Sequence, residues 1–224
     1  MNIIVEQAIY EMNLLANNVP DGKHVVTGDI RKLSAKLYRE IKDKTIDNVF
    51  FLCEELLEQH SWGLGVIAFD WAYRVKAQYN EDTYDIFYSW LKKYVRGWGD
   101  CDDFCTHAFG ELLRSQKSLF SKIKKWTKDE DFWVRRASAV ILIPAILHDD
   151  YDGIEPLIIS DLLMSDKHDL VQKGYGWMLK SFSQVDKDAV TNYLIDNHVQ
   201  MPRTAYRYAL EKYDKETRKE LMSL

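Results

Sequence analysis

Residues 62–75 read WGLGVIAFDWAYRV, and within this segment Val66, Phe69 and Ala72 follow one another at intervals of three residues. Apolar residues at this spacing predict a helix with one buried face. Similar segments start at positions 98, 132 and 170, which are 36, 34 and 38 residues after the preceding start. These segments are Trp98–Leu112, Phe132–Ile146 and Leu170–Phe182. Recurrence at this period is typical of stacked two-helix repeats, so we expect an all-α solenoid.

Helical spacing extends over almost the whole chain, and the two-residue alternation of strands is nearly absent. Only four prolines and ten glycines interrupt the 224 residues, which leaves room for many helices and few loops. We therefore expect about twelve helices in a single domain, residues 1–224. A long loop is expected over residues 17–28. Pro144 lies inside an expected helix and should kink or end it.

The charge of the chain is unevenly distributed. A formal net charge of −5 opposes binding to a phosphate backbone. Residues 114–136, however, contain eight basic and three acidic residues. The basic ones are Arg114, Lys117, Lys122, Lys124, Lys125, Lys128, Arg135 and Arg136. We therefore expect one basic face, as on proteins that bind nucleic acids.

Nothing in the sequence indicates secretion or membrane insertion. Residues 1–13 show helical spacing and two acidic residues in place of a signal peptide. The longest nearly uncharged apolar stretch, residues 137–147, is far shorter than the ~20 residues of a membrane span. Three cysteines, an odd number, fit a reducing compartment. We expect a cytoplasmic protein without a membrane partner.

The most informative segment is Gly97-Trp98-Gly99-Asp100-Cys101-Asp102-Asp103-Phe104. If a helix has begun at Trp98, Asp102 lies four residues further on the same face. An indole ring and a carboxylate together suit a positively charged guest. A structural alternative remains open, in which Asp100 caps the helix and the other two carboxylates favour its positive end.

Two further segments combine aromatic and basic residues. In Phe132-Trp133-Val134-Arg135-Arg136-Ala137, the adjacent arginines point in different directions on a helix, so one of them can hold a phosphate. In the segment 171–180, VQKGYGWMLK, two glycines inside an expected helix suggest a close approach of backbone or ligand. The alternative for the first of these segments is a solvated basic face with Trp133 in the core, and for the second it is a core position of Trp177.

No metal or other cofactor is expected. Cys101, Cys105 and His107 lack the second ligand pair of a structural zinc site, so the cysteines are better explained as buried helical residues. Residues 148–159 begin like a calcium-binding loop but end in isoleucine where a bidentate glutamate is needed.

Taken together, these segments resemble the AlkD-type alkylpurine DNA glycosylases. The matching features, in the same order and at similar separations, are Ile30-Arg31-Lys32-Leu33, Trp98 with Asp102, Trp133–Ala137, and Gln172-Lys173 with Gly176-Trp177. The resemblance covers most of the chain. It implies a right-handed solenoid of about six HEAT-like antiparallel helix pairs with a concave DNA-binding groove.

The resemblance also implies a reaction and a set of residues. The family releases N3- and N7-alkylated purines from duplex DNA, without turning the damaged base into a pocket. By motif, Asp102, Trp98 and Trp177 are the expected catalytic residues. The expected DNA-binding residues are Arg136, Arg135, Lys173 and Lys124, with Arg135 the weaker candidate of the arginine pair. The expected partner is duplex DNA with alkylated purines, bound by a monomer.

The residue types suit this chemistry. A purine alkylated at N3 or N7 is already cationic and leaves without a general acid, while positive charge develops on the deoxyribose. The ionised Asp102 can stabilise that charge and orient a water molecule. Two alternatives remain open: a non-catalytic protein that binds bent or branched DNA, and a protein-interaction scaffold.

Overall fold

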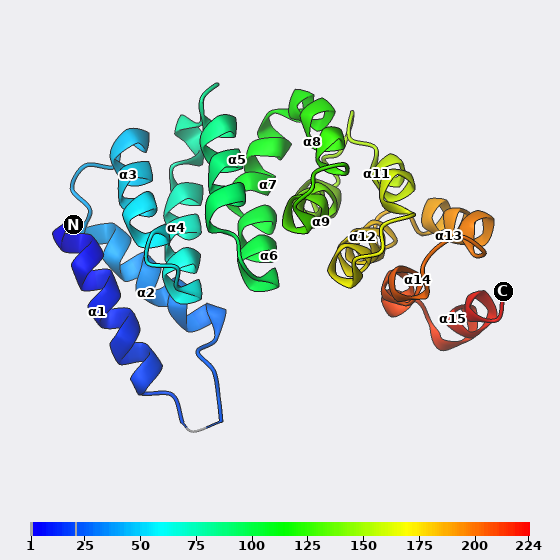
Figure 1. Cartoon of the computed structure of the whole chain (residues 1–224), viewed down its shortest axis with the longest axis horizontal. Coiled ribbons are helices and arrows are strands. Elements are labelled where there is room, and N and C mark those ends of the chain that lie inside the picture. The colour runs from blue at the N-terminus through cyan, green and yellow to red at the C-terminus, as the bar shows by residue number, and fades with distance from the viewer. Residues whose placement is uncertain (1, 21) are drawn as a thin grey trace. The chain divides into compact units, whose positions relative to one another are not determined.

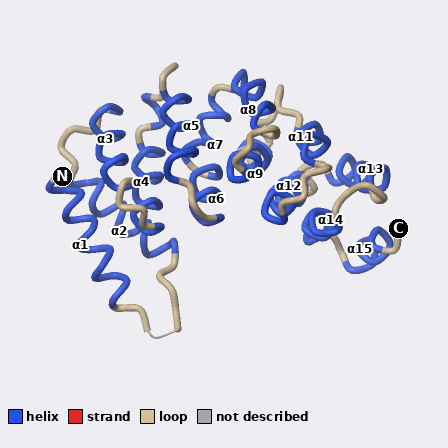
Figure 2. The backbone as a smooth tube through the Cα atoms, viewed as in Figure 1, coloured by secondary structure: helices blue, strands red, loops and turns tan. Residues whose placement is uncertain are grey.

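The computed structural model describes residues 2–20 and 22–224 and divides the chain into two compact units, Met1–Ala108 and Phe109–Leu224. Helices are the only regular elements in these residues, with no strand among them (Figure 2). The expected all-α fold is therefore confirmed. A single domain over residues 1–224 would require the two units to combine into one body, so this expectation stays a prediction.

The described part of the first unit contains six complete helices (Figure 1), and their buried apolar residues form its core. They are α1 (Ile3–Asn17), α2 (Thr27–Glu40), α3 (Ile46–Leu57), α4 (Trp62–Arg74), α5 (Thr83–Tyr94) and α6 (Trp98–Thr106), with a 3₁₀ turn at Lys76–Gln78. Helix α4 packs on α2 and on α6, and α1 packs on α3. This packing of alternate helices on one another is that of stacked helix pairs.

The second unit contains most of α7 (Ala108–Ser115) and the remaining helices. They are α8 (Phe120–Trp126), α9 (Phe132–Val140), α10 (Ile143–Leu147), α11 (Pro156–Leu163), α12 (Asp169–Phe182), α13 (Lys187–Asn197), α14 (Arg203–Ala209) and α15 (Lys215–Met222), with 3₁₀ turns at Lys117–Leu119 and Leu210–Lys212. Helix α12 packs between α9 and α14, so helices that are not consecutive in the chain again pack on one another.

Two of the four repeated segments are interrupted, which raises the number of helices above the expected twelve. The segment 98–112 breaks at His107, whose backbone (φ −124°, ψ −99°) is not helical, so α6 ends and α7 begins. In the segment 132–146, α9 ends at Val140 and Pro144 falls in the first turn of α10. A proline is tolerated there because that turn's N–H groups have no helical partner.

Glycines allow the close packing around α12 in the second unit. A Cβ on Gly176 would lie 2.7 Å from both the Ala205 carbonyl oxygen and the Tyr208 Cβ of α14. A Cβ on Gly174 would lie 3.0 Å from Cγ of Arg136 on α9. The sequence's indication of a close approach at these two positions is therefore confirmed.

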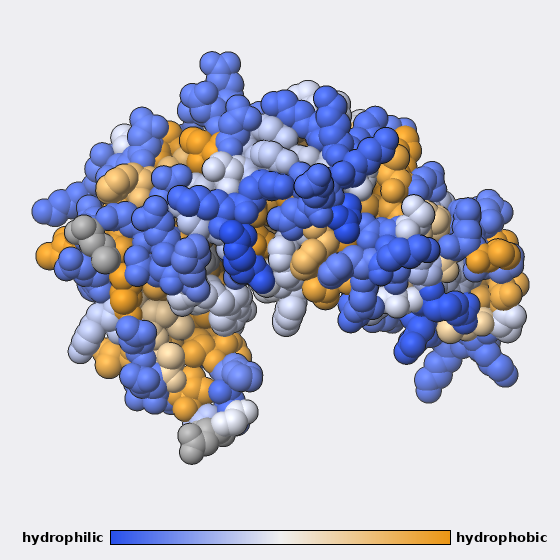
Figure 3. All heavy atoms as spheres, in the orientation of Figure 1, coloured by the Kyte–Doolittle hydropathy of each residue, from blue (hydrophilic) through white to orange (hydrophobic). Residues whose placement is uncertain are grey.

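Most of the visible surface is hydrophilic, but hydrophobic side chains reach it around α1 (Figure 3). Ile3, Tyr10 and Leu14 are the exposed large hydrophobic residues of this helix. Across residues 2–20 and 22–224, no helix has both the length and the apolar character needed to cross a membrane.

Candidate active site

Helix α6, which carries Trp98 and Asp102, has one buried and one exposed face. It begins at Trp98, directly after the extended backbone of Gly97, as the four-residue spacing of Trp98 and Asp102 requires. On the inner face, Phe104 is fully buried and stacks on Phe69 of α4 with ring centroids 4.3 Å apart. On the other face, the Trp98 side chain is 65% exposed and Asp102 is half-buried. The core contact of Phe104 thus fixes the helix that presents Trp98 and Asp102.

Trp98 and Asp102 line one cavity of about 720 Å³ in the first unit. Its wall is formed by the end of the loop before α2, the first turn of α2, the first residue of α4 and most of α6. The lining residues are His24, Val25, Thr27, Trp62, Gly97, Trp98, Gly99, Asp100, Asp102, Asp103 and Thr106. A cavity of this size, with indole rings and carboxylates in its wall, can admit part of a nucleotide.

The three carboxylates of α6 have different surroundings. Asp103 binds Arg31 of α2 through one oxygen at 2.6 Å, and its other oxygen is buried without a hydrogen bond. Asp100 accepts a hydrogen bond from the backbone N–H of Arg96 at 3.1 Å, which supports the start of the helix. Burial raises the pKa of both carboxyl groups. Gly97 is the N-cap of α6 and no described side chain caps this helix, so Asp100, its third residue, is not the cap that the structural alternative expects; Asp103 belongs to a charge network.

That network ties α6 to α2 and α4. Arg31 also binds Asp70 of α4 at 3.1 Å, and Asp70 accepts hydrogen bonds from Ser34 at 2.6 Å and from Arg74 at 2.7 Å. The ring of His107 lies 3.4 Å from the same carboxylate. Burial raises the Asp70 pKa, but the hydrogen bonds from His107, Ser34 and Arg74 outweigh it, so the pKa falls well below the ordinary value. The ionised Asp70 is therefore a fixed charge behind the cavity wall.

The segments 132–137 and 171–180, which combine aromatic and basic residues, lie on the packed helices α9 and α12 of the second unit. Arg136 is only 5% exposed and donates a hydrogen bond from one guanidinium nitrogen to the carbonyl of Leu170. Trp177 is half-buried, and no described residue forms a hydrogen bond with its indole. Trp98 and Asp102 thus lie in the first unit, and Arg136 and Trp177 lie in the second.

The remaining predicted DNA-binding residues have protein partners. Arg135 binds Asp166 at 2.6 Å and donates hydrogen bonds to two backbone carbonyls at 2.9 Å. Lys173 pairs with Asp169 one turn earlier in α12, at 2.6 Å. Lys124 lies over the ring of Phe120, 5.3 Å from its centroid. The DNA-binding roles of these three residues stay predictions. The positive charge of Arg135 is already balanced within the protein by Asp166.

Two residues of the first unit's site escaped sequence reasoning. From the sequence, Arg31 is identified only as part of the family resemblance. Its ion pairs could not be foreseen, because its partners Asp70 and Asp103 are 39 and 72 residues away. Trp62 lines the cavity with Trp98, although from the sequence it is identified only as the first residue of a repeated segment. The one feature of the sequence that points to Trp62 is the glycine at position 99. A Cβ there would lie 2.8 Å from the Trp62 indole nitrogen and would crowd the ring.

Comparison with known proteins places this chain in a family. A solved structure named "Predicted DNA alkylation repair enzyme from Enterococcus faecalis" is similar to this chain with a TM-score of 0.65. The two sequences are 16% identical, and the match covers 93% of this chain and 96% of the other, which establishes the likeness of fold. No curated protein sequence matches significantly. A sequence profile of the family described as DNA alkylation repair enzyme matches residues 24–213, and the chain therefore belongs to that family.

Proposed function

We propose that this protein is a monofunctional DNA glycosylase that hydrolyses the N-glycosidic bond of cationic N3- and N7-alkylated purines in duplex DNA. The observation that carries the proposal is the pairing of Trp98 with Asp102 on the exposed face of α6, within one roomy cavity. Membership in the alkylation repair family supports the substrate. In this proposal the protein acts as a cytoplasmic monomer and does not extrude the damaged base.

The proposed reaction needs only one carboxylate. The bond between C1′ of the deoxyribose and the purine nitrogen breaks, and its electron pair neutralises the cationic base as it leaves. Asp102 stabilises the positive charge that develops on the sugar and orients a water molecule. The water oxygen bonds to C1′ and releases a proton. We assign this role to Asp102 because it lies one helical turn after Trp98 on α6 and lines the same cavity.

The other residues hold the DNA. Trp98 and Trp177 pack against the sugar and backbone of the lesion nucleotide and favour its cationic state. Arg136, which is 5% exposed in the free protein, is the proposed contact for a phosphate. Lys173 and Lys124 add phosphate contacts that weaken as the salt concentration rises. Arg135 contributes least, because Asp166 already balances its charge.

Base release from methylated duplex DNA tests the proposal. The purified wild type should release 7-methylguanine or 3-methyladenine, and Asp102→Asn should do so at least about a hundredfold more slowly, the range for loss of a stabilising group in a transition state. Asp29→Asn is a matched control, because Asp29 is an exposed acid of the same unit paired with Lys32. Release by neither wild type nor control refutes the activity, and equal release by all three refutes the role of Asp102.

A further inference from the structure

The four tryptophans of the first unit fall into two classes. Trp71 and Trp90 are fully buried, and their indole N–H groups donate to the carbonyl of Ser34 at 3.2 Å and to the carboxylate of Glu54 at 2.8 Å. Trp62 and Trp98 are 38% and 65% exposed, and no described residue forms a hydrogen bond with either indole. A tryptophan of the core normally finds a partner for its N–H group. Trp62 therefore belongs with Trp98 and not with the core.

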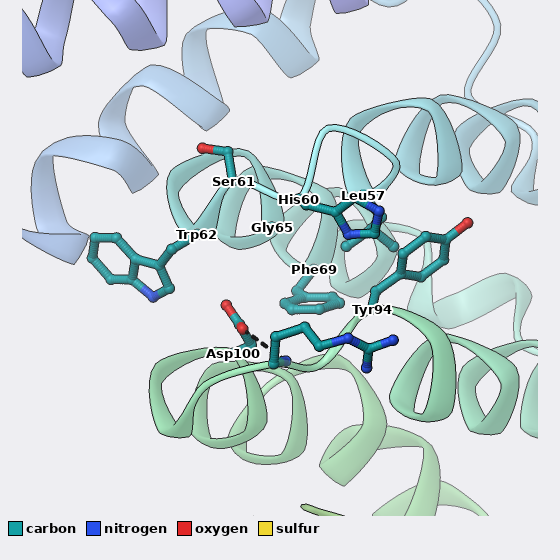
Figure 4. Close-up of a pocket in the computed structure, with 9 residues that line it drawn as sticks. Leu57, His60, Ser61, Trp62, Gly65, Phe69, Tyr94 and Asp100 are labelled. Carbon is teal, nitrogen blue, oxygen red and sulfur yellow. Dashed lines mark hydrogen bonds between the residues drawn. The ribbon is translucent and has the colours of Figure 1, made fainter.

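The position of Trp62 is built into the neighbouring helix. Trp62 is the first residue of α4, and its indole nitrogen lies 2.8 Å from the place where a Cβ of residue 99 would be. Glycine at position 99 leaves the room for this approach. Figure 4 shows the indole nitrogen of Trp62 turned toward the helix that carries Asp100. The ring thus lies against the first turn of α6, beside Trp98.

Trp62 lines two cavities, and only one of them can hold a ligand. The smaller, about 40 Å³, is bounded by Leu57, Phe69 and Tyr94 and has room for a few water molecules at most (Figure 4). The larger is the cavity of about 720 Å³ that Trp62 shares with Trp98 and Asp102. Of these two cavities, the one that can enclose a ligand beside Trp62 is therefore the cavity of the proposed reaction.

We propose that Trp62 is a third indole of the substrate site and binds the sugar–phosphate backbone at the lesion; this inference rests on the proposed function. The ring face packs against the C–H groups of a deoxyribose, and its N–H donates to a sugar or phosphate oxygen. Three carboxylates line the cavity, and they cannot donate to such oxygens when ionised. A neutral donor is suited to this place, because a lysine would oppose the positive charge that develops on the sugar.

This role predicts a weaker complex and an unchanged chemical step. The contact exists before and during bond cleavage, so its loss should raise Kd and KM but leave kcat within about twofold of the wild type. Trp62→Ala should raise the Kd of a duplex containing a tetrahydrofuran abasic site at least about fivefold, the lower end for loss of one stacked aromatic ring. Phe51→Ala is the matched control, because Phe51 is a 56% exposed aromatic residue of the same unit and lines neither cavity.

The experiment measures that Kd, the kinetics of 7-methylguanine release and the melting temperature for both variants. A Kd within about twofold of the wild type for Trp62→Ala overturns the inference, as does an equal loss in Phe51→Ala. If Trp62→Ala does not fold, Trp62→Phe decides, because it keeps a ring and removes the N–H group. Its Kd should rise at least about twofold, the lower end for one hydrogen bond, and an unchanged Kd overturns the inference.

The outcome for Trp62 can be separated from the outcome for the proposed function. Base release by the wild type, together with wild-type binding by Trp62→Ala, leaves the glycosylase standing and removes Trp62 from its site. Absence of base release by the wild type, together with weakened binding by Trp62→Ala, refutes the glycosylase and keeps Trp62 as a DNA contact.

Discussion

Replacing Asp70 with asparagine should destabilise the first unit by about 2–3 kcal/mol at pH 7. The Asp70 side chain is 7% exposed and binds two arginines, Arg31 and Arg74. Removing one partner of a buried ion pair typically costs about 3–5 kcal/mol. We place the cost below that range because the two arginine side chains are 29% and 33% exposed and can regain water.

The effect of this substitution should depend on pH with a definite sign. The pKa of Asp70 in the folded protein is lower than its ordinary value, so the ionised carboxylate stabilises the fold. That contribution is fully present above the unfolded pKa, about 3.9, and is lost as the pH falls toward the folded pKa. The difference in unfolding free energy between wild type and Asp70→Asn should therefore be greatest at neutral pH and shrink below about pH 4.

Urea unfolding followed by circular dichroism, at pH 7 and in steps down to pH 3, measures this difference. Asp29→Asn is the control, because that carboxylate is 46% exposed, pairs with Lys32 at 2.8 Å and should change stability by less than about 1 kcal/mol. A loss below about 1 kcal/mol for Asp70→Asn, or a loss that is the same at pH 3 and pH 7, would show that the network does not stabilise the fold as argued.

Three other substitutions test the second unit, and a fourth, Gly65→Ala, is a control in the first unit. Gly176→Ala places a Cβ 2.7 Å from a carbonyl oxygen of α14 and should lower stability by about 1–2 kcal/mol, even after the gain in helix propensity. In Gly65→Ala the nearest contact of the new Cβ is at 3.8 Å, so stability should rise by up to about 1 kcal/mol. Thermal melting that shifts in the same direction for both variants contradicts the argument. Asp131→Ala removes the side chain that accepts from the second N–H group of α9 and should lower stability by about 1 kcal/mol, seen as a fall of about 2–4 °C in Tm. Arg135→Met should reduce Tm more clearly than DNA affinity, and a filter-binding assay with the opposite ranking would restore Arg135 as a main phosphate contact.

The helices were predictable because helix formation depends on near neighbours. The three-residue spacing in the segment 62–75 predicted α4, and the same pattern predicted that a helix would begin at Trp98. Two mid-helix glycines predicted a close approach in α12, which the contacts of Gly176 confirm. The interruption at His107 was not predicted, because no proline or glycine marks it.

The charged part of the site was not predictable in this way. The partners of Arg31 lie 39 and 72 residues away, and only the packing of α2, α4 and α6 brings them together. The burial of Arg136 was hidden for the same reason, because it depends on the packing of α12 against α9. The spacing of Trp98 and Asp102 is local to one helix, so their shared face followed from the sequence alone.

The most direct test of the central claim compares two DNA duplexes that differ in one charge. One carries a protonated pyrrolidine in place of a deoxyribose, which imitates the positive sugar of the transition state, and the other carries a neutral tetrahydrofuran. The wild type should bind the cationic duplex at least about tenfold more tightly, which corresponds to ~1.4 kcal/mol, and Asp102→Asn should lose that preference. Equal affinity of the wild type for the two duplexes, or a preference that survives in Asp102→Asn, would contradict the proposed role of Asp102.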